Sequence, residues 1–196
     1  MEFAELVRRR RMVHHFAPRP VPAEVLDSIL EAARHSPSAG FSQGLGLIVL
    51  DDPEQLAWFW QTSQGHEAPA DAPPVVVLPV PDKRVYLERY RLPDKGGPDG
   101  PRSQESGWPV PYFWDLDAAM ACMMMLLKAA DVGIGAWLFG IQQGQDELVA
   151  TLGVPPGLRV IGALGFGYAA EGDRMEGSSV TRPRRTLSDF VHRGGW

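Results

Sequence analysis

Positive charge is concentrated near the start of the chain, where residues 8–16 read RRRRMVHHF. Guanidinium groups bind phosphate through paired, charge-assisted hydrogen bonds, because their planar donors match two phosphate oxygens. Consecutive helical residues lie about 100° apart, so the four arginines cannot all face one ligand. One or two of them, together with His14, are therefore candidates for a phosphate-monoester site. A solvated basic helix face and a nucleic-acid patch are the alternatives.

A second basic cluster lies at the other end, where residues 181–196 read TRPRRTLSDFVHRGGW. Two basic segments in an otherwise acidic chain predict that both contact one dianionic ligand. Between them, residues 36–44 read SPSAGFSQG, and the small residues there let the backbone approach a flat ligand closely. The hydroxyl groups of this segment and the amide of Gln43 supply hydrogen bonds for such a ligand.

The chain as a whole is mildly acidic, since its 196 residues carry a formal net charge of −5. Bulk attraction to nucleic acid or to an anionic membrane is therefore not expected, and any anion site must be local. The length suits a single domain over residues 1–196. Cys122 is the only cysteine, no apolar run is long enough to cross a bilayer, and no secretory signal is evident. These features favour a cytoplasmic location.

Apolar periodicity predicts the elements that must position these residues. Helices are expected at 3–10, 21–35, 53–60, 83–91, 113–132 and 146–152. Strands are expected at 45–50, 73–80, 134–138 and 159–166. The interleaving of the two predicts an α/β or α+β domain. The segment 93–111 is a loop long enough to be either functional or disordered.

The helix expected at 113–132 is the most apolar element. Its clearest apolar stripe contains Leu116, Met120, Met123, Met124, Leu127 and Ala130. Asp115 and Asp117 lie in its first turn, where the helix dipole favours acidic side chains. Because apolar residues cover nearly all of its circumference, the helix is expected in a core or in an oligomer interface.

Five motifs then occur in a fixed order along the chain: RRxVxxF, PSAGxxQ, GIGAWLFG, ALGFG and RRTLSDFVH. In this order they resemble the nitroreductase family of FMN-dependent oxidoreductases, over nearly the whole length. The resemblance implies an α+β fold with a mixed sheet flanked by helices, and an obligate homodimer. It also implies one FMN per subunit at the dimer interface, with helix 113–132 as the main dimer element.

The resemblance also assigns residues to the cofactor. The expected cofactor-binding residues are Arg10, Arg11, Met12, His14, Pro37, Ser38, Ala39, Gln43, Phe139, Gly140, Arg184 and Arg185. The arginines are expected at the phosphate or the ribityl chain, with either Arg184 or Arg185 supplied by the tail. Residues 37–39 match the segment that lies along the isoalloxazine, and a backbone N–H at Phe139 or Gly140 matches the donor that faces flavin N5.

Phe41, Tyr112 and Trp108 are the expected substrate contacts. Phe41 stands where the family often has asparagine, which predicts a more apolar pocket. Tyr112 and Trp108 belong to an aromatic cluster that is predicted either to pack at the dimer surface or to cover the flavin as a lid. No catalytic side chain and no metal ligand is expected, because the flavin carries the chemistry.

The activity implied is transfer of reducing equivalents from NAD(P)H, through flavin N5, to a small planar or conjugated acceptor in ping-pong turnover. Preorganised backbone donors would stabilise the charge that develops on the flavin. One alternative is an oxidoreductase that uses a deazaflavin donor. Another is a flavin-binding or sequestering protein without turnover, since Met12, His14 and Phe41 depart from the family pattern. A nucleic-acid binder is disfavoured by the acidic balance.

Overall fold

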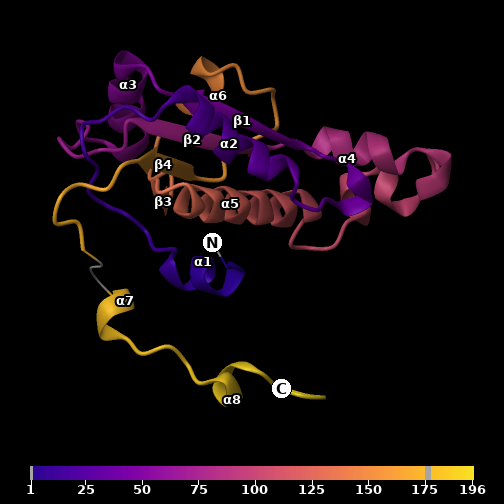
Figure 1. Cartoon of the computed structure of the whole chain (residues 1–196). Helices are drawn as coiled ribbons and strands as arrows, with labels where there is room; N and C mark the ends of the chain where they lie inside the picture. Colours follow the sequence, from indigo (N-terminus) through magenta and orange to yellow (C-terminus); the bar gives the residue numbers. More distant parts are fainter. Residues whose placement is uncertain (1, 175–177) are drawn as a thin grey trace.

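A computed structural model describes residues 2–174 and 178–196 of the chain. Its centre is a four-stranded sheet with the strand order β1-β2-β4-β3 (Figure 1). The strands are β1 Leu45–Leu50, β2 Val75–Pro81, β3 Gly135–Phe139 and β4 Ala163–Gly167. Each runs antiparallel to its neighbours. The expectation of a mixed sheet is therefore corrected to that of an antiparallel sheet. Among the described residues, parallel pairing is confined to the isolated bridge between Met12 and Ala136.

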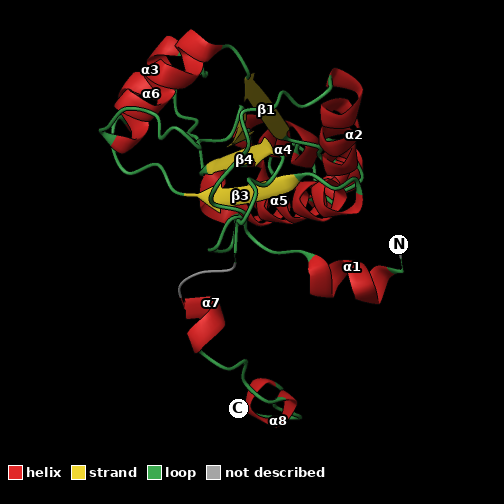
Figure 2. Cartoon of the chain, turned by 60° about the vertical axis from the view of Figure 1, so that its left-hand side comes forward, coloured by secondary structure: helices red, strands yellow, loops and turns green. Residues whose placement is uncertain are grey.

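Helices cover both faces of the sheet, which gives three layers (Figure 2). The helices are α1 Phe3–Arg9, α2 Ala23–Arg34, α3 Pro53–Gln64, α4 Lys83–Tyr90, α5 Phe113–Asp131, α6 Gln145–Thr151, α7 Ser178–Thr181 and α8 Leu187–Phe190. Alternate residues of a strand point to opposite faces. Val75 and Val77 of β2 accordingly pack with α2 and α5, whereas Val76 and Leu78 pack with α3 and α6. The α+β class is thus confirmed.

The long helix α5 has two unlike faces. One face is buried against the sheet and α2, through residues such as Ala121, Met125 and Ala129. The other carries the apolar stripe noted in the sequence, and Leu116, Met120 and Met123 there are 40%, 41% and 40% exposed. Contiguous apolar side chains left uncovered on one chain mark an interaction surface. The stripe defined by these three residues is called the α5 stripe below.

Residues 82–112, called the arm below, extend from the layered body beside the loop that precedes β1 (Figure 1). The arm contains α4 and three short 3₁₀ turns. Trp108 is buried there among aromatic rings that include Tyr86 and Trp114, and its indole N–H donates to the carbonyl oxygen of Arg102 at 2.9 Å. From the sequence, the loop 93–111 was expected to be either functional or disordered. It is ordered around an aromatic core.

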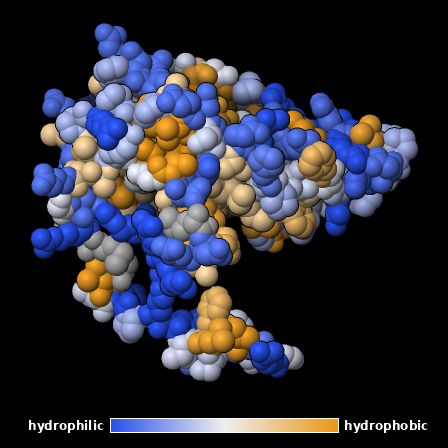
Figure 3. Space-filling view, in the orientation of Figure 1, coloured by the Kyte–Doolittle hydropathy of each residue, from blue (hydrophilic) through white to orange (hydrophobic). Residues whose placement is uncertain are grey.

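Both ends of the chain lie outside the three layers. α1 lies below α5, and the tail of residues 178–196 runs away from the body beyond it (Figures 1 and 2). Leu187, Phe190 and Trp196 of the tail are exposed. Hydrophobic groups gather at this end of the molecule in the space-filling view (Figure 3). Large exposed apolar side chains of this kind are typical of interaction surfaces.

Candidate functional site

The four arginines of residues 8–11 are placed differently. Arg8 lies exposed on α1, which ends at Arg9. The guanidinium of Arg11 forms an ion pair with the carboxylate of Asp173, and it also donates to the carbonyl oxygen of Met12 at 3.2 Å. Arg10 is half-buried and lines a cavity. Of the two arginines predicted to bind phosphate, Arg10 faces a cavity and Arg11 is engaged within the chain.

The cavity beside Arg10, called the β3 cavity, has a volume of about 380 Å³. It lies between α5 and the edge of the sheet, and most of its lining is apolar. The apolar side chains that line it are those of Met12, Pro79, Ala119, Cys122, Met123, Leu126, Leu138 and Ile161. Within residues 2–174 and 178–196 no acidic side chain is ion-paired with Arg10. An apolar slot with one available guanidinium at its rim suits a flat ring that carries an anionic group.

A second cavity, of about 660 Å³, lies along the same helix. Pro37, Ser38 and Ala39 line one side of it, and residues of the α5 stripe line the other. Ala119 and Met123 border both this cavity and the β3 cavity. Arg10, which is predicted to bind phosphate, and residues 37–39, which are predicted to contact the ring, therefore line two cavities that both border the uncovered face of α5.

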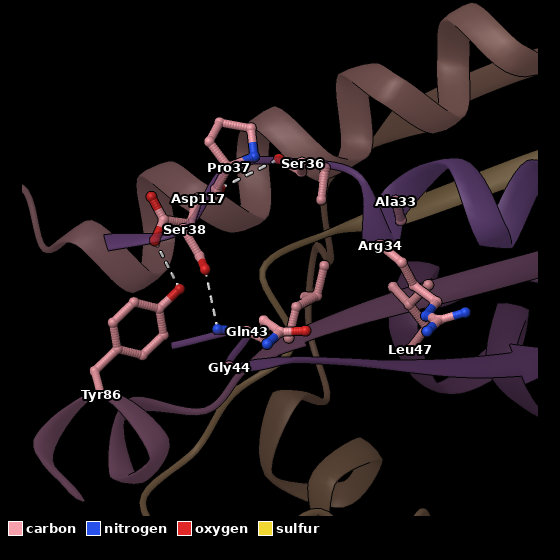
Figure 4. A pocket seen from close by; sticks show the side chains of 12 residues that line it. Ala33, Arg34, Ser36, Pro37, Ser38, Gln43, Gly44, Leu47, Tyr86 and Asp117 are labelled. Atoms are coloured by element: carbon pink, nitrogen blue, oxygen red, sulfur yellow. Dashed lines mark hydrogen bonds between the residues drawn. The ribbon is translucent and has the colours of Figure 1, made fainter. Parts of the chain in front are cut away.

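A third cavity of about 300 Å³ lies under the loop that precedes β1 (Figure 4). Gln43 lines it, and its backbone N–H donates to Ser38 Oγ at 3.0 Å. Asp117 of α5 lies on the opposite wall, where its Oδ2 accepts from the Tyr86 hydroxyl at 2.8 Å. Burial, together with this bond, raises the pKa of Tyr86 far above its usual range, so the hydroxyl remains a donor.

Asp117 was expected only as an acid that complements the helix dipole. It is instead 6% exposed, and the same Oδ2 accepts from the backbone N–H of Ala39 at 2.8 Å. The side chain thus joins α5, the arm and the loop before β1. No local sequence signal identifies this role, because Ala39 lies 78 residues away along the chain.

The other predicted cofactor residues differ in how they face the β3 cavity. His14 is exposed, and its ring centroid lies 5.1 Å from that of Trp137, whose side chain leaves β3 on the face opposite Leu138. The ring of Phe139 stacks on Trp137 at 4.4 Å against the core, so the ring itself does not face the β3 cavity. Gly140 is exposed at the end of β3, and its carbonyl oxygen accepts from Gln64 Nε2 at 3.0 Å.

The tail and the arm hold the remaining predicted residues. Arg184 and Arg185 are exposed between α7 and α8, in the part of the chain that runs away from the body (Figure 1). Among the predicted substrate contacts, Phe41 is 72% exposed. Tyr112 is half-buried and stacks on Trp114 at 4.4 Å, and Trp108 is buried. Contact of Arg184, Arg185, Tyr112 and Trp108 with a ligand stays a prediction.

One polar cluster that sequence reasoning missed holds the N-terminal segment in place. His15 Nδ1 lies 2.5 Å from Asp71 Oδ2, and the His15 backbone N–H donates to Asp173 Oδ1 at 3.3 Å. The Phe16 N–H donates to the Asp71 carbonyl oxygen at 2.9 Å. Together with the Arg11–Asp173 ion pair, these contacts anchor residues 11–16 and thereby fix Arg10 and Met12 at the cavity.

Asp71→Asn is expected to destabilise the protein near neutral pH but not in acid. The hydrogen bond from His15 lowers the pKa of Asp71 below its ordinary value of 3.8, so the fold favours the charged carboxylate. The stabilisation is complete above a pH of about 4 and is lost as the pH falls through the lowered pKa. The pair is half-exposed, and such pairs contribute about 0.2–1 kcal/mol, so the melting temperature of the variant is expected to fall by up to about 4 °C.

Thermal unfolding of both proteins between pH 3 and pH 7 measures this difference. Asp99→Asn, which changes an exposed aspartate of the arm, is the matched control and should leave the melting temperature unchanged. An Asp71→Asn deficit of the same size at pH 3 and pH 7 would contradict the assigned ion pair.

The fold and its cavities together define the class: an α+β domain whose ligand-sized cavities open along an uncovered helix. A family model described as the nitroreductase family matches residues 7–96. The chain is 26% identical over 201 residues to an Archaeoglobus fulgidus protein named as a proposed NADH dehydrogenase/NAD(P)H nitroreductase, with 100% of this chain and 99% of the relative covered. The family model and this relative agree with the resemblance that the five motifs indicated.

Solved structures bear out the fold. A nitroreductase family protein of Clostridium difficile 630 superposes with a TM-score of 0.73 at 23% identity, covering 100% of both chains. An FMN-dependent nitroreductase of Clostridium difficile R20291 gives a TM-score of 0.71 at 20% identity, covering 99% of this chain and 100% of that one. At these identities the likeness establishes the fold. Among the described residues, no helix is both long and apolar enough to cross a membrane.

Proposed function

We propose that the protein is an FMN-dependent oxidoreductase that passes reducing equivalents from NAD(P)H to a small planar or conjugated acceptor. The observation that carries the proposal is the β3 cavity, where an available guanidinium, that of Arg10, stands at the rim of an apolar slot. The names of the relatives support the same conclusion, since one is an NAD(P)H nitroreductase by name and another an FMN-dependent nitroreductase.

In this proposal Arg10 binds the phosphate of FMN, and Met12, Leu138 and Ile161 pack against its ring system. An apolar slot excludes water, which strengthens the charge-assisted bond at Arg10. His14 belongs to the same segment but packs against Trp137, on the face of β3 opposite the cavity, so the proposal assigns it no contact with the phosphate. Arg11, which is paired with Asp173, holds the segment rather than the phosphate.

A homodimer completes the site in this proposal. A twofold interface buries the same surface of both copies, and the α5 stripe is an uncovered apolar surface of the kind such an interface needs. Both cavities border this stripe, so packing α5 against its copy brings residues 37–39 of one copy toward the β3 cavity of the other. The exposed tail then reaches across, and Arg184 or Arg185 contributes to the partner's phosphate site.

When bound, FMN supplies two-electron chemistry, taking up reducing equivalents from a nicotinamide and releasing them to an acceptor in alternate half-reactions. The chain's own contribution is orientation and electrostatics. Backbone N–H groups at Phe139 and Gly140 have a fixed direction and need no proton of their own, which suits stabilisation of developing negative charge. The bond from Gln64 to the Gly140 carbonyl oxygen fixes the adjoining peptide.

The absorbance spectrum of the purified protein tests the proposal. A flavin band, with FMN released on denaturation, is expected, and anaerobic NADH or NADPH is expected to bleach it. Bleaching by dithionite but by neither nicotinamide would favour a deazaflavin donor. A band that no biological donor bleaches would indicate a flavin-sequestering protein. A colourless protein that does not take up added FMN would overturn the proposal.

A further inference from the structure

The loop that precedes β1 has an unusual backbone. Gly40, Phe41 and Gln43 have φ values of 64°, 53° and 56°. Left-handed backbone is open to glycine, but it costs conformational energy for a residue with a Cβ, and it is uncommon for a bulky aromatic residue. Backbone strain of this kind persists where the surroundings over-determine the conformation, and it is concentrated at functional sites.

Three contacts, one from α5 and two from α4, hold the loop in this shape. The Ala39 N–H donates to the buried Asp117 carboxylate at 2.8 Å, and Arg89 Nε donates to the Gly40 carbonyl oxygen at 2.9 Å. The Tyr90 ring lies directly behind Gly40, so close that a Cβ there would stand 2.8 Å from it. The loop therefore rests on α5 and on the arm, and its shape is fixed before any ligand arrives.

The strained loop displays the ring of Phe41. That ring is 72% exposed, so the cost of placing phenylalanine in left-handed backbone is not recovered by burial within the chain. Glycine would satisfy the same backbone without strain. The residues that precede Gly40 in the loop, Pro37, Ser38 and Ala39, line the cavity beside the α5 stripe. Phe41 therefore follows the lining of this cavity by two positions along the chain, on a backbone that the surrounding contacts hold fixed.

We propose that Phe41 is a specificity-determining residue whose ring lies against a planar, uncharged conjugated acceptor, and that Asp117 is the positioning residue that sets its direction. The proposal rests on the proposed oxidoreductase function. Stacking favours flat conjugated molecules over compact ones. An anionic acceptor is not favoured, because Arg89, the cation that contacts this loop at the Gly40 carbonyl oxygen, is held by Asp94 at 2.6–2.8 Å.

The first test is Phe41→Gly, which removes the ring and relieves the backbone at once. The melting temperature of the cofactor-free protein is expected to stay the same or rise. In the FMN-loaded protein, the ratio of kcat/KM for a planar quinone to that for ferricyanide, a compact octahedral acceptor, is expected to fall roughly threefold to tenfold. The fall should come from a higher KM for the quinone.

Leu92→Gly is the matched control. Leu92 is also an exposed apolar residue beside a short 3₁₀ turn, but its φ is −72°, so glycine relieves no strain there. This variant is expected to melt at a lower temperature and to keep the wild-type acceptor ratio. An acceptor ratio in Phe41→Gly that matches the wild type would overturn the role of the ring, and a melting temperature lowered as in Leu92→Gly would overturn the inferred strain.

Asp117→Ala tests the positioning role with Phe41 left in place. It should lower the acceptor ratio as Phe41→Gly does, and the two changes together should add little, because both act through one ring. Ala39→Pro is the second variant, since it removes only the N–H that Asp117 binds and should lower the ratio in the same way. Full additivity, or an unchanged ratio in both variants, would overturn the role of Asp117.

These outcomes are distinct from failure of the proposed function. A wild-type protein that neither binds FMN nor reduces either acceptor overturns both, whereas a wild-type enzyme that reduces both acceptors, with an unaltered ratio in Phe41→Gly, overturns only the role of Phe41. The melting temperature of the cofactor-free variant tests the strain by itself.

Discussion

A glutamate in place of Met120 is expected to convert the protein into monomers that no longer retain FMN. Met120 lies between Leu116 and Met123 on the α5 stripe and is 41% exposed in the single chain. A twofold interface places each new carboxylate beside the same residue of the other copy or within its apolar surface. Burying an unpaired charge costs several kcal/mol. Dimer affinity should therefore fall by at least about a hundredfold, which corresponds to about 2.7 kcal/mol.

Loss of FMN follows because both cavities border the α5 stripe. Sedimentation velocity over a concentration series measures the dissociation, and the flavin-to-protein ratio after gel filtration measures retention. Circular dichroism should remain that of the wild type, since Met120 faces away from the core.

Val110→Glu is the matched control for this change, because Val110 is also an exposed apolar residue but lies on the arm. It is expected to remain dimeric and to keep FMN. A Met120→Glu protein that sediments as a dimer at every concentration would show that the interface does not use α5.

Local patterns were enough to predict most of the elements of this fold. The spacing of apolar residues identified α5 and even its outward stripe, because helical periodicity is written into neighbouring residues. Element ends were less well predicted. α3 continues to Gln64, where Gly65 with a φ of 77° ends it, and β4 begins at Ala163 rather than at residue 159.

Contacts between distant residues account for what the sequence could not provide. The four arginines of residues 8–11 are chemically alike, and what separates Arg10 from Arg11 is Asp173, which lies 162 residues further along the chain. The strain at Phe41 likewise depends on Asp117 and on the arm. The types of the side chains predicted the chemistry of the site. Tertiary contacts decide which residue of a given type is available to bind a ligand.

The phosphate contact predicted for the tail is not formed within a single chain. Arg184 and Arg185 were expected to meet the N-terminal arginines at one phosphate. Within a single chain they lie on a segment that leaves the body (Figure 1). In the proposed homodimer their convergence with Arg10 depends on the second copy, which the sequence motif implied only through the family resemblance.

Arg10→Ala is expected to weaken FMN binding by roughly ten- to a hundredfold while leaving the fold intact. Hydrogen bonds to a charged group contribute about 1.5–3 kcal/mol, and tenfold in affinity corresponds to about 1.4 kcal/mol. Arg10 lines the β3 cavity and is the cation there without an ion-pair partner among the described residues. Fluorescence titration of the cofactor-free protein with FMN measures the change.

The neighbouring arginines make this experiment specific, since each variant removes one positive charge within four positions. Arg8→Ala changes an exposed residue of α1 and should leave FMN affinity unchanged. Arg11→Ala leaves the Asp173 carboxylate without its guanidinium partner, so it should lower the melting temperature more than it lowers affinity. Equal effects on affinity in all three variants would indicate only diffuse attraction to a basic segment. A selective loss in Arg10→Ala, smaller at high salt because screening already weakens the wild type, would locate the phosphate at the β3 cavity.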